Sequence, residues 1–134
     1  MIPYQAKSRK VSGSSYGEVL RNAFAVFDEI KKKTKRRPYV RSAYFKKEKI
    51  FLDYFREHLF QKSPKERMAR LKYFKAAVEL VKNSKNDPAV KDNPNKRGEV
   101  LHKFAGLTAE KELFFVQIKE DKRGRKYMMS CFGL

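Results

Sequence analysis

The chain has 134 residues and a strong excess of positive charge, since 33 Lys and Arg stand against 15 Asp and Glu, a formal net charge of +18. Its length suits one domain, so we expect residues 1–134 to fold as a single unit. A hydrophobic content of 41%, with 11 Phe and 7 Tyr, is enough for a core and excludes wholesale disorder. The single cysteine, Cys131, excludes an intrachain disulfide and a Cys-rich zinc site.

The hydropathy and charge of the chain indicate its surroundings and its partners. No stretch approaches the ~20 apolar residues of a membrane span, and the N-terminus has no apolar run long enough for a secretory signal. We therefore expect a cytoplasmic protein with no membrane-spanning segment. A basic protein gains affinity for a polyanion by releasing condensed counterions. Nucleic acid is the first candidate partner, and an anionic membrane surface or an acidic inhibitor protein comes second.

The first helix is expected directly after a basic tail of residues 1–15, which has little to bury. Ser15 and Glu18 form a capping box, a pattern that marks the start of a helix. We expect this helix over residues 16–33, because apolar residues then recur at helical spacing. These residues are Val19, Leu20, Ala23, Phe24, Phe27 and Ile30.

Two more helices are expected before the pattern changes. Ser42 is a candidate cap for a helix over residues 43–61. Ser63 and Pro64, with a glutamate two residues later, mark the start of a third helix over residues 64–82. The apolar faces of these helices would consist of Phe51, Tyr54, Phe55, His58 and Leu59, and of Met68, Leu71, Phe74, Val78 and Val81.

The C-terminal third predicts a sheet. Residues 83–98 are rich in asparagine and contain prolines and a glycine, so we expect a linker. The sequence as a whole predicts an α+β fold, in which an N-terminal three-helix portion (16–82) packs on a C-terminal antiparallel β-meander (99–134). The meander has three strands, and whether a fourth strand joins them stays open. The strands, joined by loops short enough for hairpins, are expected at 99–106, 112–119 and 125–132.

The expected hairpin turns set a register for this meander. With the turns centred near residues 109–110 and 122–123, Phe114, Val116, Ile118 and Cys131 share an apolar face that would pack on the helices. A slip of one residue would invert the two faces, and the wholly apolar character of this face is the reason for preferring the register. The open face would then carry His102, Gln117, Lys119, Lys126 and Ser130, framed by Phe104 and Phe115.

The residues of this open face suit RNA cleavage without a metal or other cofactor. RNA carries its own nucleophile, the 2′-hydroxyl, so the protein has to move protons and stabilise charge on the phosphorane. An imidazole of pKa ~6.5 suits proton transfer, which makes His102 a candidate catalytic residue. Phe104 and Phe115 are candidates for base stacking. The cations expected to bind nucleic acid are Lys31, Lys32, Lys35, Arg36, Arg37, Arg97, Lys103, Lys119, Arg123, Arg125 and Lys126.

Other interpretations stay open. His102 can be an ordinary surface or core residue, and His58 is predicted to be a buried packing histidine. The cations of residues 31–37 can be a solvated helix end. The same face can bind RNA or DNA without cleaving it, or the basic surface can dock on an acidic protein. Zinc, Walker and dinucleotide-binding motifs are absent, and no close carboxylate pair is available for a two-metal nuclease.

The last forty residues resemble a family of small ribonucleases. A histidine in the first strand (EVLHKFAGL), an apolar second strand (ELFFVQIKED), a basic hairpin with a glycine, and a last strand with a hydroxyl (YMMSCF) are similar to the barnase–EndoU–colicin–RelE superfamily, in particular its phage- and mobile-element-associated members. The resemblance covers residues 97–134. It implies a metal-independent endoribonuclease, often a toxin with a cognate antitoxin or inhibitor, that acts on tRNA or mRNA. It would make His102 the acid/base residue and Ser130 the catalytic hydroxyl, with phosphate ligands at Lys103, Lys119, Arg125 and Lys126.

Overall fold

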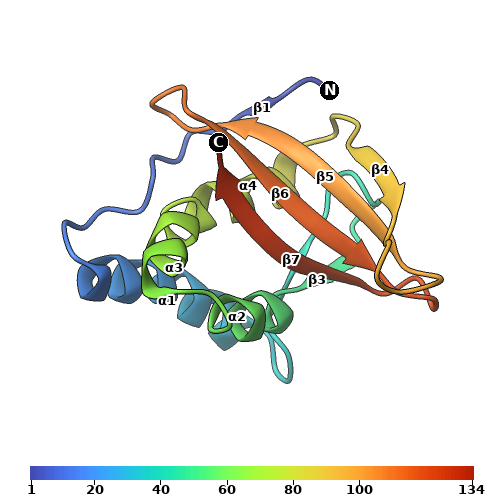
Figure 1. The fold of residues 1–134 in the computed structure, drawn as a ribbon, viewed down its shortest axis with the longest axis horizontal. Coiled ribbons are helices and arrows are strands. Elements are labelled where there is room, and N and C mark those ends of the chain that lie inside the picture. The colour runs from blue at the N-terminus through green and yellow to red at the C-terminus, as the bar shows by residue number, and fades with distance from the viewer.

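A computed structural model describes residues 1–134 and shows an α+β fold with one curled sheet (Figure 1). The sheet is mixed and 7-stranded, and helices are interspersed among its strands along the sequence. The helices are α1 (Tyr16–Lys33), α2 (Asp53–Leu59), α3 (Pro64–Leu71) and α4 (Phe74–Asn83). The strands are β1 (Tyr4–Gln5), β2 (Tyr39–Arg41), β3 (Lys49–Phe51), β4 (Ala89–Asp92), β5 (Val100–Leu107), β6 (Leu113–Glu120) and β7 (Lys126–Gly133).

Strands from both halves of the chain build the sheet. Its order is β1-β5-β6-β7-β3-β2, and β4 also pairs with β5. The β5–β6–β7 meander is antiparallel and lies within one residue of the expected bounds, whereas β1 and β3 pair in parallel with β5 and β7. The predicted arrangement of an N-terminal three-helix portion on a C-terminal meander is wrong. Three short strands come from residues 1–51, and β4 comes from the predicted linker 83–98.

The predicted starts of two helices are confirmed. The Ser15 hydroxyl accepts a hydrogen bond from the Glu18 N–H, and α1 spans the expected residues 16–33. The Ser63 hydroxyl caps α3 in the same way by accepting from the Glu66 N–H (3.3 Å). Each cap joins residues three positions apart, so the local sequence is enough to specify it.

Residues 43–61 do not form the predicted second helix. β2 and β3 form an antiparallel hairpin instead, and the helix that follows begins only at Asp53. The Ser42 hydroxyl accepts from the Phe45 N–H (3.0 Å) and therefore stabilises a turn rather than a helix. β3 also pairs in parallel with β7. Because β7 lies far along the chain, no local pattern in this segment could indicate that pairing.

The predicted third helix, residues 64–82, is divided into α3 and α4 by a turn at Lys72 and Tyr73. The turn lets α3 lie along β7, while α4 buries most of its side chains against α1 and the sheet. The Tyr73 ring stacks on the Phe114 ring of β6, with centroids 5.8 Å apart. This stacking contributes aromatic packing that holds the turn against the sheet.

The N-terminal segment is not the loose tail that its composition predicts. β1 pairs with the end of β5, and Ala6 and Val11 are buried in the hydrophobic core. The Glu79 carboxylate of α4 accepts hydrogen bonds from the Tyr4 hydroxyl (2.9 Å) and from the Ser8 hydroxyl (2.7 Å). Burial and the nearby Glu79 carboxylate raise the pKa of Tyr4 to about 12. The first residues are therefore an integral part of the fold.

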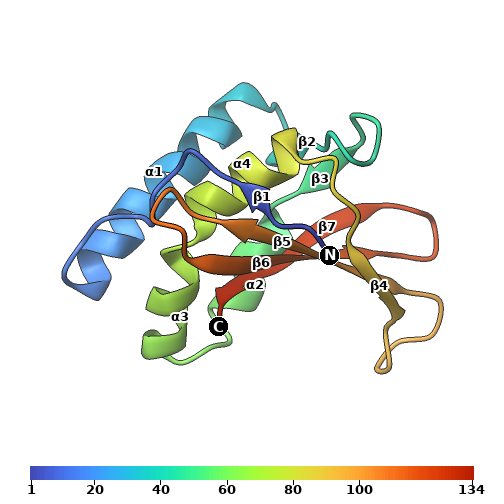
Figure 2. The same cartoon turned by 90° about the horizontal axis from the view of Figure 1, so that it is seen from above.

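The helices cover one face of the sheet and one of its margins. α1 and α4 lie behind the sheet and α2 and α3 lie along β7 (Figures 1 and 2). On the covered side, called the inner face, Phe114, Val116 and Ile118 are buried as predicted. No helix combines the length and the apolarity that a membrane crossing requires. The opposite side of β5–β7 is called the outer face, and strand pairing assigns to it Leu101, Lys103, Ala105, Phe115, Gln117, Lys119, Tyr127, Ser130 and Phe132.

Candidate nucleic-acid interface

The predicted position of His102 on the open face of the sheet is wrong. His102 pairs with Ile118, and Phe104 pairs with Val116, which places both rings on the inner face. The turn between β5 and β6 is one residue longer than expected, which shifts the register by one residue, and Lys111 within this turn adopts a left-handed conformation (φ 67°). Phe104 is 3% exposed and is a core residue, so it cannot stack on a base.

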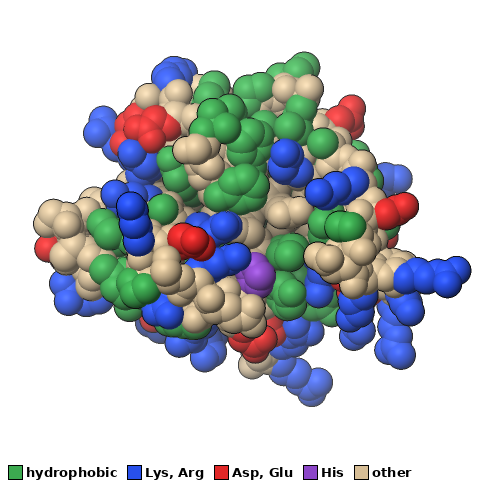
Figure 3. All heavy atoms as spheres, in the orientation of Figure 1, with side chains coloured by type: hydrophobic (Ala, Val, Ile, Leu, Met, Phe, Trp, Pro, Cys, Tyr) green, Lys and Arg blue, Asp and Glu red, His purple; other side chains and the backbone are tan.

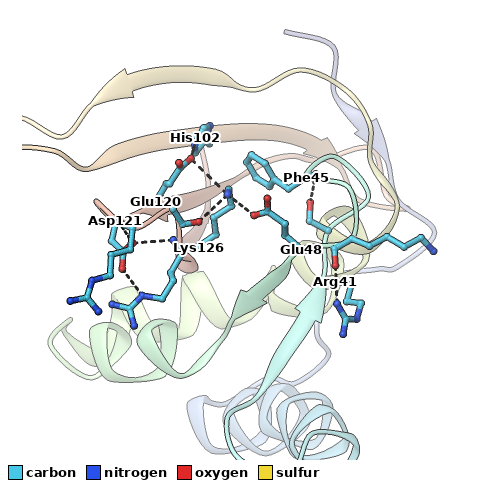
Figure 4. A network of polar contacts seen from close by, with 12 residues as sticks. Arg41, Phe45, Glu48, His102, Glu120, Asp121 and Lys126 are labelled. Atoms are coloured by element: carbon cyan, nitrogen blue, oxygen red, sulfur yellow. Dashed lines mark hydrogen bonds and ion pairs between the residues drawn. The ribbon is translucent and has the colours of Figure 1, made fainter.

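The His102 imidazole is enclosed between β5 and the loop that joins β2 to β3 (Figure 4). It is 9% exposed, its Nε2 lies 2.9 Å from Oε1 of Glu120, and its Nδ1 is buried without a partner. The Phe45 ring covers it edge-on, with centroids 5.0 Å apart. The proton-transfer role predicted for His102 depended on an imidazole that faces solvent, so this geometry gives that role no support.

Lys126 was expected to bind phosphate, but it lies in the same inner cluster and is 7% exposed. Its Nζ lies 2.5 Å from Oε2 of Glu48, donates to the Gly124 carbonyl at 3.0 Å and lies 4.0 Å from Oε1 of Glu120. Lys126 points inward because it pairs across β6 and β7 with Glu120, which also faces inward. The predicted assignment to the phosphate-binding face is wrong.

Four of the predicted site residues do lie together on the outer face. Lys103, Phe115, Lys119 and Ser130 face away from α1 and α4, and the Lys103 ammonium lies 5.0 Å from the centre of the Phe115 ring. A β-bulge after Met128 keeps Ser130 on this side, where it pairs with Gln117. The Ser130 side chain is buried, however, and its hydroxyl accepts a hydrogen bond from the Arg70 guanidinium.

The outer face combines apolar and cationic groups. Hydrophobic side chains gather over the strands, with Lys and Arg side chains around them (Figure 3). At the margin of this face, aromatic rings and cations from four elements and from the loop between α1 and β2 alternate. We call this set the aromatic stripe, and it consists of Arg37, Phe51, Tyr54, His58, Lys119 and Tyr127.

Cation–π contacts hold the aromatic stripe together. The Arg37 guanidinium lies 4.2 Å from the centre of the Phe51 ring and 5.5 Å from that of Tyr127. The Lys119 ammonium lies 4.1 Å from the centre of the Tyr54 ring. All these rings are half-buried, with one part packed on the protein and another open to solvent. Such contacts orient both partners, because the ring quadrupole attracts the cation to its face.

Arg37 is positioned from α2. Its Nε and Nη2 each donate to the Asp53 carboxylate at 2.9 Å, a two-bond geometry that fixes the plane of the guanidinium. Hydrogen bonding to Asp53 raises the pKa of Arg37. Phe51 and Asp53 lie two residues apart at the β3–α2 junction, so one short segment supplies both the ring and the carboxylate.

His58 is not the buried packing histidine that the helix pattern predicts. Phe55 and Leu59 of α2 fill the core, while the half-exposed His58 ring stacks on Tyr54, with centroids 5.9 Å apart and planes at 13°. Burial, together with nearby cations that include Lys119, lowers the pKa of His58. The sequence carried a signal for this position. Tyr54 and His58 are four residues apart and so share one side of the helix, and each lies one residue before a core residue, Phe55 or Leu59.

The remaining predicted cations lie outside the aromatic stripe. Arg97 and Arg123 are exposed in loops beside the hairpins, and the Arg125 guanidinium is bound by Asp121 (3.0 Å). Lys35 and Arg36 follow α1 and line a hollow of about 520 Å³ that extends to Arg37 and Phe51 of the stripe. Lys31 and Lys32 are exposed at the end of α1.

No protein-family model, curated protein or solved structure matches this chain. The resemblance to the barnase–EndoU–colicin–RelE superfamily therefore stays a prediction. Nowhere do three His, Cys, Asp or Glu side chains come close enough to hold a metal ion. The arrangement on the outer face can do two things chemically. It can stack planar groups on its open rings, and it can neutralise anions with the cations beside them.

Proposed function

We propose that this protein binds single-stranded nucleic acid, RNA in preference, along its outer face in the cytoplasm. The observation that carries the proposal is the aromatic stripe, in which half-exposed rings alternate with cations held at 4.1–5.5 Å from them. Single-strand binding proteins combine rings on which bases stack with a cationic path for the backbone, and each stacked base contributes ~1–3 kcal/mol. The net charge of +18 favours the same class of partner.

Binding of a labelled 12-nucleotide RNA, followed by fluorescence anisotropy, tests the proposal. Tyr127→Leu and Tyr54→Leu keep apolar bulk but remove a stacking ring, so each is expected to weaken binding by about 5- to 100-fold. Tyr16→Leu, at the start of α1 and outside the stripe, is the matched control and is expected to bind like the native protein. Equal affinity of the stripe variants and the native protein would exclude the stripe as the binding site.

The same assay with the DNA version of the probe measures the preference for RNA. Affinity is also expected to fall steeply as salt rises, because each phosphate contact releases counterions, with a slope of about −0.7 per contact for single strands. A slope near zero would favour a partner other than a polyanion. An acidic inhibitor protein, the partner that the resemblance implies, would compete with RNA for these cations.

A second candidate function is metal-independent cleavage of the bound RNA, and the position of His58 favours it. In this reaction the 2′-oxygen bonds to phosphorus and the 2′-proton passes to the neutral His58 imidazole. The P–O5′ bond breaks and the 5′-oxygen takes a proton from water, leaving a cyclic phosphate and a 5′-hydroxyl. A lowered pKa keeps the imidazole neutral and available as a base, and Lys119 and Arg70 are near enough to influence its charge.

Incubation of RNA with the protein in EDTA, followed by mapping of new ends, tests the cleavage candidate. His58→Ala is expected to abolish cleavage and to retain most RNA binding, whereas His102→Ala is expected to cleave like the native protein. Expression of an active ribonuclease without an inhibitor is also expected to slow cell growth, and His58→Ala to restore it. Loss of cleavage in His102→Ala alone would instead assign proton transfer to His102.

A further inference from the structure

A second cationic surface lies away from the outer face, where α1, α4 and the β2–β3 hairpin meet (Figure 2). Here a groove of about 1010 Å³ is lined by side chains from the C-terminal ends of both helices and from the hairpin. No Asp or Glu lines it. The groove is defined by its six cations, which are Lys33, Arg41, Lys46, Lys47, Lys82 and Lys85.

None of the groove cations takes part in an ion pair. Some cations elsewhere are paired, as Lys10 is with Glu112 (2.9 Å), but most Lys and Arg side chains of the protein are not, so what distinguishes the groove is that six cations and no carboxylate line one hollow. Cations are favourable near the C-terminal ends of α1 and α4, where the helix dipoles are negative. This stabilisation is confined to the last turn of each helix, and one or two charges are enough for it. The concentration of unpaired lysines is therefore greater than helix capping requires.

The turn at the tip of the β2–β3 hairpin holds two of these lysines in a backbone conformation that disfavours them. Lys46 and Lys47 both have positive φ, 53° and 68°, and the Glu48 N–H donates to the Phe45 carbonyl (3.1 Å). Positive φ at both central residues is the backbone of a type I′ turn, which strongly favours Asn–Gly. Side chains with a Cβ are unfavourable in this conformation. The chain therefore places lysine where other residues would stabilise the hairpin better.

The groove is continuous with the proposed binding face. It shares Lys33 and Tyr39 with the smaller hollow that reaches Arg37 and Phe51 of the aromatic stripe. Tyr39 is the only aromatic ring that lines it, so the groove offers charge but little stacking surface. Lysine ammonium groups act as point charges toward phosphate, which suits the regularly charged backbone of a duplex.

We propose that the groove binds the phosphate backbone of a duplex segment, while the aromatic stripe binds the adjoining single strand. The substrate class is then an RNA stem with a single-stranded extension. This inference rests on the proposed function, because it needs the stripe to hold the extension.

The test compares Lys46→Asn combined with Lys47→Gly against a control, Lys65→Gln combined with Lys75→Gln. The control removes two exposed charges from α3 and α4 that line neither surface. Three RNA probes are used, which are a 12-nucleotide single strand, a blunt 12-base-pair stem, and that stem with a 12-nucleotide extension.

The stem with the extension is expected to bind the native protein most tightly. Each duplex phosphate contact contributes a factor of about 5.5 at 0.15 M salt relative to 1 M. The turn variant is thus expected to lose about 30-fold in affinity for this probe, and its salt slope is expected to fall by about 1.8. Its affinity for the single strand is expected to stay within about 2-fold, because the stripe is intact. Its Tm is expected to rise by roughly 3–8 °C, since the favoured turn residues replace lysines.

A higher Tm with weaker stem binding separates a functional role from damage to the fold. Two results would overturn the inference and leave the stripe proposal intact. In the first, the native protein binds the stem with the extension no more tightly than the single strand. In the second, the turn variant binds the stem with the extension as tightly as the native protein does. It is also overturned if the turn variant loses as much affinity for the single strand as for the stem with the extension. If the native protein binds no single strand, the proposed function itself fails.

Discussion

The ion pair between Lys126 and Glu48 allows a sharp prediction, because its two partners differ in burial. The Lys126 side chain is 7% exposed and that of Glu48 is 53% exposed. Glu120, the other nearby carboxylate, is 4.0 Å from the ammonium and already 2.9 Å from the His102 ring. Removing either partner of the pair breaks the same contact, but the residue left behind is in water in one case and in the protein interior in the other.

The cost of each substitution follows from what remains. Lys126→Met leaves Glu48 in water and places an apolar side chain against Phe45. The substitution loses a charge-assisted hydrogen bond worth ~1.5–3 kcal/mol, but the new apolar contact and the solvation of Glu48 offset most of that loss. The net cost in the free energy of unfolding is therefore about 1 kcal/mol. Glu48→Ala leaves a buried ammonium that retains mainly the Gly124 carbonyl, which costs about 3 kcal/mol. Substitution of the more exposed residue is therefore expected to be the more destabilising.

Urea denaturation at pH 7 measures the difference. With a slope of about 1.5 kcal/mol per M, the midpoint is expected to fall by about 0.7 M for Lys126→Met and about 2 M for Glu48→Ala. The double variant is expected to resemble Lys126→Met, because no buried charge remains. Glu57→Ala removes an exposed carboxylate of α2 that forms no ion pair and serves as the control. A larger loss for Lys126→Met than for Glu48→Ala would refute this reasoning.

Three further predictions concern the core and the N-terminal segment. Gly106→Ala would place a Cβ 2.5 Å from the Phe114 ring, so overpacking is expected to lower the free energy of unfolding by about 1–3 kcal/mol in thermal denaturation. Burial raises the pKa of Cys131 to about 12, so its thiol is expected to resist alkylation at pH 8 until urea unfolds the protein, as a mass-spectrometric time course would show. Burial raises the pKa of Glu79, but hydrogen bonds, of which the bond from the Ser8 hydroxyl has the largest effect, outweigh burial and lower this pKa from its ordinary value of 4.5. Its contribution to stability is therefore complete above pH 4.5 and is lost as the pH falls below that value, and Glu79→Gln is expected to flatten the dependence of Tm on pH between 2.5 and 6.

The sequence predicts correctly those features whose signals are local. The hydroxyls of Ser15 and Ser63 act on N–H groups three residues away, and the alternation of Phe114, Val116 and Ile118 identifies the buried face of β6 without knowledge of any partner strand. The hairpin formed by β2 and β3 could not be predicted in this way. Its strand β3 pairs with the distant β7, and its own sequence shows only the aromatic spacing that also suits a helix.

The position of His102 shows how one residue of turn length decides a candidate site. The expected turn and the observed turn between β5 and β6 differ by a single residue at Lys111, yet the imidazole moves from the solvent side to the core side. Lys119 and Phe115 kept their predicted face because the apolar alternation of β6 fixes it independently. The half-exposed position of His58 was missed because the prediction treated every residue of the apolar face as buried, whereas only Phe55 and Leu59 of α2 are buried and Tyr54 and His58 lie at the margin of that face.

The β2–β3 hairpin connects the two proposed binding surfaces. Phe51 at its end belongs to the aromatic stripe, and Lys46 and Lys47 at its tip belong to the cationic groove. Two contacts fix the hairpin to β7. Next to the tip, Glu48 forms an ion pair with Lys126, and at the far end of β3, Phe51 pairs with Tyr127. Its tip therefore has little freedom to move relative to the stripe. A rigid separation between a stacking site and a charged groove favours an RNA in which stem and extension meet at a fixed place, so the position of that junction, rather than the base sequence, is expected to determine affinity.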